Sequence, residues 1–114
     1  MSDDRLARLS AAIRARRDAD PESSYVARLF AKGRERIAQK VGEEAVEAII
    51  AATRGDAQAL KGEAADLVFH LAVLLESLGL GFDDVLAELE RREGTSGLAE
   101  KAARSGVSRP KRGD

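Results

Sequence analysis

Acidic side chains recur at helical spacing in two segments of the chain, and their pattern predicts a site for a divalent metal ion. The first segment holds Glu43, Glu44 and Glu47, and the second holds Glu63 and Asp66. Residues three positions apart share one face of a helix, so Glu44 lies near Glu47 and Glu63 near Asp66. Sites built from carboxylate oxygens favour Mg²⁺ or Mn²⁺ over zinc, and Mg²⁺ commonly takes phosphate oxygens as further ligands. We therefore expect a magnesium site that receives a phosphate-bearing substrate.

Two long helices must bring these segments together. The first is expected from about Arg34 to Arg54 and ends at Gly55, and the second is capped by Asp56 and runs to about Ser77. A connection this short makes the two helices antiparallel neighbours, so residues equally far from the turn lie at the same height. Counting outward from Gly55 gives three matched pairs: Glu47 with Glu63, Glu44 with Asp66, and Lys40 with His70.

The matched carboxylates would repel one another unless they bind a cation, because unpaired charge in a partly dry groove is costly. We expect Glu44, Glu47, Glu63 and Asp66 to bind the metal. Glu43 is expected to be a further ligand or the base that orients the attacking water. Taken singly, each acidic pair could equally be solvated surface charge, and the matching of two pairs favours the metal site.

Basic residues and one histidine flank the acidic group. Lys32, Arg36 and Lys40 are candidates for binding phosphate, and their alternative is ordinary pairing with neighbouring acidic side chains. His70 is expected to bind substrate or to make a hydrogen bond to an acidic ligand.

The whole chain is expected to be all-α, with about five helices and a central antiparallel pair. Further helices are predicted around Leu6 to Ile13, from Ser24 to Gly33, and from about Phe82 to Glu93. We expect one domain over residues 1–104 and a flexible tail over residues 105–114.

Composition limits the class of protein. Alanine supplies 21 of the 114 residues and aromatic residues are few, so the core of one chain is thin and we expect self-association to supply the missing core. There is no cysteine, which excludes disulfides and thiolate-bound zinc. The apolar runs are too short to span a membrane, and no basic, aromatic face favours nucleic acid. We expect a cytoplasmic protein.

Longer runs of sequence resemble one family. The chain is similar to the phosphoribosyl-ATP pyrophosphohydrolases of histidine biosynthesis, and the wider superfamily shares the pattern EExxE followed by ExxD. The resemblance is carried by the runs SYVARLF at Ser24 to Phe30, IAQKVGEE at Ile37 to Glu44, EAADL at Glu63 to Leu67 with His70, and SGLAEKAAR at Ser96 to Arg104.

The resemblance implies a Mg²⁺-dependent homodimer with a four-helix-bundle-like core. Its implied activity is hydrolysis of phosphoribosyl-ATP between the α and β phosphates, which releases phosphoribosyl-AMP and pyrophosphate. Glu43, Glu44 and Glu47 are then the expected catalytic carboxylates. Arg92, Lys101 and Arg104 are candidates for closing over the ribose phosphate. Two alternatives stay open: a house-cleaning pyrophosphatase acting on ordinary or damaged nucleoside triphosphates, and a helical binding module without catalysis.

Overall fold

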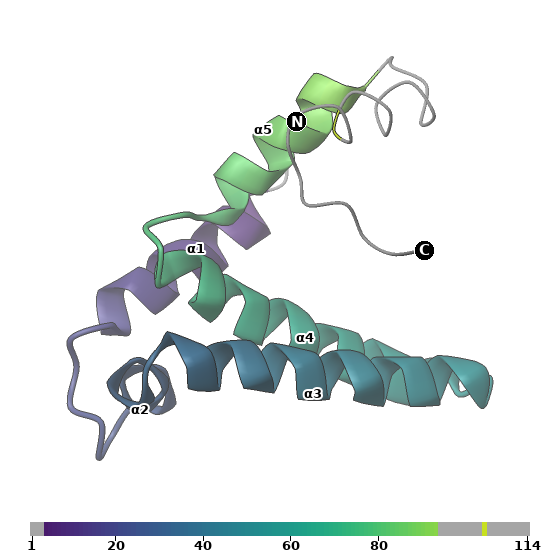
Figure 1. Ribbon diagram of the computed structural model, residues 1–114, viewed down its shortest axis with the longest axis horizontal. Coiled ribbons are helices and arrows are strands. Elements are labelled where there is room, and N and C mark those ends of the chain that lie inside the picture. Colours follow the sequence, from purple (N-terminus) through teal and green to yellow (C-terminus); the bar gives the residue numbers. More distant parts are fainter. Residues whose placement is uncertain (1–3, 94–103, 105–114) are drawn as a thin grey trace. The chain divides into compact units, whose positions relative to one another are not determined.

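A computed structural model describes residues 4–93 and Arg104, and the described part contains helices and no strand (Figure 1). The predicted all-α fold is therefore confirmed. The five helices of residues 4–93 are α1 (Arg5–Arg16), α2 (Tyr25–Lys32), α3 (Arg34–Thr53), α4 (Ala57–Glu76) and α5 (Phe82–Arg92).

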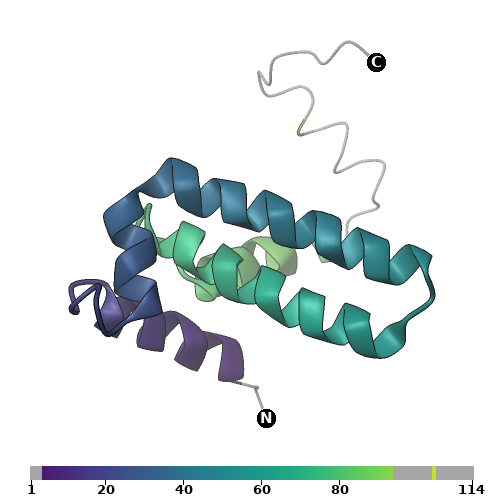
Figure 2. The same cartoon turned by 90° about the horizontal axis from the view of Figure 1, so that it is seen from below.

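The central hairpin consists of α3 and α4, which run side by side in opposite directions (Figure 2). Each has 20 residues, so each is about 30 Å long. Gly55 makes the turn with a φ of 71°, in the left-handed region that glycine adopts without strain. Asp56 caps α4 by accepting a hydrogen bond from the backbone N–H of Ala59 at 3.0 Å. The predicted antiparallel pair is confirmed.

The core lies where α1 and α2 pack against one end of this hairpin. Ser24 caps α2 by accepting a hydrogen bond from the backbone N–H of Ala27, and this fixes where the helix begins. Ile13, Ile37 and Val73 are the largest fully buried side chains of the described chain. The buried cluster comprises Ile13, Val26, Leu29, Ile37, Ala72, Val73 and Phe82.

Three arginines converge on the carboxyl end of α4. Arg14 Nε lies 3.2 Å from a carboxylate oxygen of the buried Glu76, and Arg17 donates to the backbone carbonyl of Glu76. Arg34 donates to both the hydroxyl and the carbonyl of Ser77. The last carbonyls of a helix lack partners within the helix and carry partial negative charge, so these cations tie α1 and α3 to the end of α4.

Contacts divide the chain after Asp83, so most of α5 belongs to a second unit. Within α5, hydrogen bonds from Arg91 and Arg92 lower the pKa of Glu88 to about 2. The expected tail over residues 105–114 lies outside the described residues, and the single domain over residues 1–104 stays a prediction. In the part of the chain that the structure describes, no helix has the length and apolar content to cross a membrane.

One face of α3 remains uncovered. The sequence predicts that this helix is apolar over most of its circumference and buried on most sides. In the single chain, however, Val46, Ile49 and Ile50 are 54 %, 60 % and 43 % exposed. The contacts of α3 with α4 and α2 leave these three side chains exposed.

Candidate functional site

Three carboxylates from the two central helices come together near the middle of the hairpin. Glu44 on α3 and Glu63 and Asp66 on α4 each place one oxygen within 4.8 Å of the others. Two oxygens on opposite sides of a Mg²⁺ ion are about 4.2 Å apart, so small side-chain movements would let all three bind one ion. Acidic oxygens without nitrogen or sulfur are the donor set that Mg²⁺ and Mn²⁺ prefer, and the group therefore fits such an ion.

Negative charge is in excess within the group. Loss of hydration raises the pKa of Glu63 above its ordinary value, and the negative charges of Glu47, Glu44 and Asp66 raise it further. Glu47 lies outside the group of oxygens within 4.8 Å, and its side chain is exposed. The structure thus brings three of the four predicted ligands together and places Glu47 near enough to act on Glu63 through its charge.

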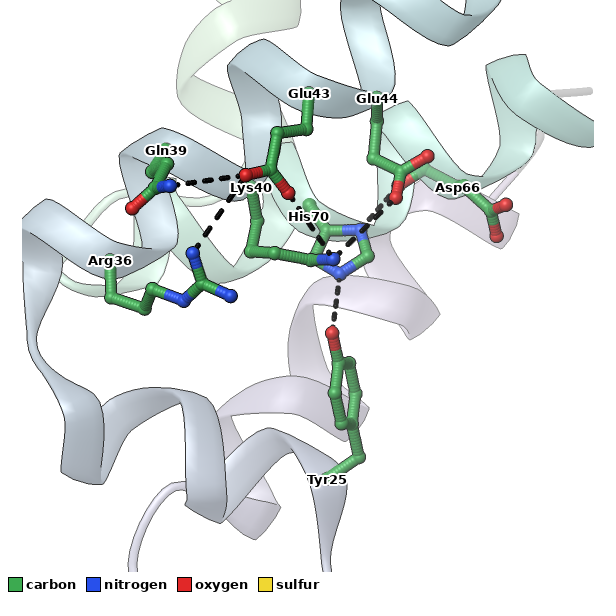
Figure 3. Close-up of polar contacts among 8 residues, drawn as sticks. All are labelled: Tyr25, Arg36, Gln39, Lys40, Glu43, Glu44, Asp66 and His70. Atoms are coloured by element: carbon green, nitrogen blue, oxygen red, sulfur yellow. Dashed lines mark hydrogen bonds and ion pairs between the residues drawn. The ribbon is translucent and has the colours of Figure 1, made fainter.

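Lys40 separates Glu43 from Glu44, and Glu43 lies among cationic and amide side chains (Figure 3). Its carboxylate accepts a hydrogen bond from Gln39 Nε2 at 3.1 Å and lies 3.6 Å from Lys40 Nζ and 3.8 Å from Arg36 Nη1. Lys40 Nζ also lies 3.9 Å from a carboxylate oxygen of Glu44. Lys40 therefore bridges Glu43 and the three-carboxylate group, and a positive pair, Lys40 and Arg36, borders the candidate metal site.

His70 lies beneath the site and is buried. It makes a hydrogen bond to Asp66, but to the backbone carbonyl rather than to the carboxylate. Its other ring nitrogen makes a hydrogen bond with the hydroxyl group of Tyr25, the first residue of α2. No pattern in the sequence predicts a role for Tyr25, although this residue lies in one of the runs that carry the family resemblance.

The remaining candidates for substrate binding are Lys32, Arg92, Lys101 and Arg104. Lys32 is exposed in the last turn of α2. Arg92 pairs with Glu88 within α5, at 2.9 Å. Arg104 is half-buried, and its Nε has no hydrogen-bond partner among the described residues. Lys101 lies outside the described residues.

Comparison with known proteins gives a consistent result. The family model described as "Phosphoribosyl-ATP pyrophosphohydrolase" matches residues 6–93. A protein of Rhizorhabdus wittichii named phosphoribosyl-ATP pyrophosphatase is 68 % identical over 99 residues, covering 87 % of this chain and 93 % of the relative. Proteins of the same name from Erythrobacter litoralis and Novosphingobium aromaticivorans are each 64 % identical, covering 87 % and 88 % of this chain and 95 % and 94 % of their own lengths.

Proposed function

This chain belongs to the phosphoribosyl-ATP pyrophosphohydrolase family, and on that premise we propose how its carboxylate site acts. The enzyme hydrolyses phosphoribosyl-ATP between the α and β phosphates, giving phosphoribosyl-AMP and pyrophosphate, in the second step of histidine biosynthesis. The observation that carries the mechanism is the convergence of Glu44, Glu63 and Asp66 beside Lys40. We place the reaction in the cytoplasm.

The metal ion proposed for this site is Mg²⁺, with Mn²⁺ as a substitute. Glu44, Glu63 and Asp66 would hold it, and Glu47 would turn in as the fourth carboxylate. When bound, such an ion neutralises charge on the attacked phosphate and on the departing pyrophosphate. Loss of hydration raises the pKa of Glu63, and repulsion by Glu47, Glu44 and Asp66 raises it further; a cation relieves this repulsion, which supports the assignment.

The positive pair supplies the phosphate contacts. In the free chain, Lys40 and Arg36 face Glu43, and incoming phosphate oxygens would compete with that carboxylate for both cations. We assign Glu43 to holding these side chains in place rather than to activating water, because its described partners are Gln39, Lys40 and Arg36. Lys32 and the basic residues Arg92, Lys101 and Arg104 stay candidates for further substrate contacts.

A second copy of the chain is proposed to cover the apolar face of α3. Burial of a large aliphatic side chain contributes about 1.5 to 3 kcal/mol, and the face exposes three of them. Ile49→Asp should therefore shift the protein toward monomer in analytical ultracentrifugation. Gln58→Asp, an exposed substitution on α4, is the matched control and should leave the assembly unchanged. Equal sedimentation of the two variants and the wild type would refute this interface.

The catalytic proposal is tested by product analysis. Purified protein and Mg²⁺ are incubated with phosphoribosyl-ATP, ATP or dCTP, and the products are separated by anion exchange. We expect pyrophosphate and phosphoribosyl-AMP from the first substrate only, and neither from Glu44→Gln. Turnover of ATP and dCTP alone would indicate a house-cleaning enzyme, and turnover of none would favour a binding module.

A further inference from the structure

A chain of two hydrogen bonds links the start of α2 to the turn of α4 that carries the candidate metal ligands (Figure 3). The Tyr25 hydroxyl oxygen lies 2.8 Å from His70 Nε2, and His70 Nδ1 lies 2.8 Å from the backbone carbonyl oxygen of Asp66. We propose that Tyr25 is a positioning residue that acts through His70 to hold Asp66 for metal binding. The inference rests on the metal site proposed above and adds a residue from outside the acidic helices to it.

The donors and acceptors define one arrangement of protons. A carbonyl oxygen can only accept a hydrogen bond, so His70 Nδ1 must carry the proton and donate it to Asp66. In the neutral ring, Nε2 then has a lone pair, and the Tyr25 hydroxyl donates to it. His70 is 6 % exposed, so little water can reach the ring to take over the role of Tyr25. The Asp66 carbonyl therefore fixes the tautomer of His70, and the Tyr25 hydroxyl satisfies the nitrogen that remains.

Aromatic packing restrains the same imidazole ring. Phe69 meets it edge to face with ring centroids 5.2 Å apart, and Tyr25 meets it edge to face at 5.8 Å. Tyr25 in turn stacks on Phe69 at 6.0 Å. The imidazole is thus hydrogen-bonded at both nitrogens and packed by two rings, which leaves it a single orientation.

The Asp66 carbonyl oxygen thus accepts hydrogen bonds from two donors. Within an α-helix this carbonyl already accepts the backbone N–H of His70, four residues later. The ring Nδ1–H adds a side-chain bond to the same oxygen, so the turn from Asp66 to His70 is held more firmly than an ordinary helical turn. The Asp66 carboxylate itself is exposed, and a fixed backbone lowers the cost of ordering it around an ion.

Tyr25→Phe tests the proposal because it removes the hydroxyl and keeps the ring that packs on Phe69. In the full-length protein, Mn²⁺ binding is followed by the electron paramagnetic resonance of the free ion. Loss of a partner that supports a metal ligand weakens metal binding by about 10-fold to 100-fold, and we expect about 10-fold here. Excess Mn²⁺ should restore kcat, because the proposed ligands and phosphate contacts remain intact.

The single histidine of the chain provides a readout that needs no metal. At a pH above the ordinary titration range of histidine, ¹H–¹⁵N spectra of the wild type should show the Nδ1-protonated tautomer, and Tyr25→Phe should shift the Nε2 resonance, because that nitrogen loses its hydrogen bond. His70→Gln, whose amide can both donate and accept, should retain more Mn²⁺ affinity than His70→Leu. Far-ultraviolet circular dichroism establishes that each variant has folded.

Three results would overturn the proposal. Wild-type Mn²⁺ affinity in Tyr25→Phe would refute the positioning role alone and leave the metal site standing. An Nε2-protonated histidine in the wild type would refute the hydrogen-bond chain. Failure of the wild type to bind Mn²⁺ would refute this inference together with the metal site of the proposed function.

Discussion

Without metal, the Glu44→Gln variant should be more stable than the wild type, and addition of a metal ion should reverse this order. In the metal-free protein, Glu44 lies within 4.8 Å of two other carboxylates and 3.9 Å from one cation, Lys40. The neutral amide has nearly the same shape and removes one member of the cluster. The metal-free variant should therefore be more stable than the metal-free wild type, although it has lost a ligand.

The size of the effect follows from the separations. Two unit charges at 4.8 Å, the limit for Glu44 and Asp66, repel by about 1 kcal/mol in bulk water. In the wild type, Glu44 is repelled by Glu63 and by Asp66, and its attraction to Lys40 offsets one of these two repulsions. Removal of the charge in Glu44→Gln should therefore stabilise the metal-free protein by about 1 kcal/mol. For a domain of this size, that gain should raise Tm by about 4 °C. An ion at 100 times its Kd stabilises the wild type by about 2.7 kcal/mol, which outweighs the gain.

Thermal unfolding measured by circular dichroism, at one protein concentration with and without Mn²⁺, checks this reversal. Glu90→Gln, a substitution of an exposed glutamate on α5, is the control and should follow the wild type in both conditions. A variant that is less stable than the wild type without metal would show that Glu44 is mainly a structural ion-pair partner. Equal stabilisation of both proteins by Mn²⁺ would place the ion elsewhere.

Further substitutions test other parts of the site and fold. Because the pKa of Glu63 is raised, protons should compete with Mn²⁺ at a higher pH than they would at an ordinary glutamate, and isothermal titration should show that affinity decreases as the pH is lowered. The ionised Glu63 opposes folding above its raised pKa, and this cost disappears as the carboxylate protonates at lower pH. A Glu63→Gln variant that kept the wild-type slope of stability against pH would contradict this. Lys40→Gln should raise the inhibition constant of pyrophosphate several-fold and change Mn²⁺ affinity less; an unchanged inhibition constant would exclude Lys40 from phosphate binding. Ser24→Ala should lower the free energy of unfolding by about 1 kcal/mol in urea titrations through loss of the α2 cap, and no loss would mean that the cap is dispensable.

The helices could be predicted because their end signals are local. Ser24 and Asp56 act as N-caps in the structure, and Gly33 and Gly55 lie at the carboxyl ends of α2 and α3 with positive φ. A cap bonds to a backbone group three residues away, so it depends little on the rest of the fold. The predicted ends of α3 and α4 consequently lie within one residue of those observed.

The sequence predicts how far along the hairpin axis each carboxylate lies, but not the direction in which its side chain points. Glu44 and Asp66 are each eleven residues from Gly55, and the structure brings them together. Glu47 and Glu63 are each eight residues from Gly55, yet Glu47 lies outside the close group. Whether a side chain reaches the group also depends on the angle by which α3 is rotated about its own axis, and this angle brings Glu44, not Glu47, to the other carboxylates. Counting from a turn gives no information about this angle.

Counting residues from the turn could not predict the contact between Tyr25 and His70. His70 is 45 residues away from Tyr25, on a helix outside the local segment that holds Tyr25. The contact depends on where α2 packs against the hairpin, and that position is set by tertiary burial of residues such as Val26 and Leu29. The spacing of residues in a short amphipathic helix does not predict which side chain a tyrosine at its start will contact in the folded protein.

The exposed face of α3 connects the proposed interface between two copies of the chain with the candidate metal site. Its helical periodicity shows that Val46, Ile49 and Ile50 are apolar together, but periodicity does not identify what covers them. Glu47 is exposed in the single chain and lies three residues before Ile50, so the two side chains are neighbours on the surface of α3. A second copy seated on this face would therefore lie beside the one predicted ligand that stands apart from the carboxylate group. If so, Ile49→Asp should weaken Mn²⁺ binding as well as dimerisation, although it changes no carboxylate, because it removes the neighbour that would restrict Glu47.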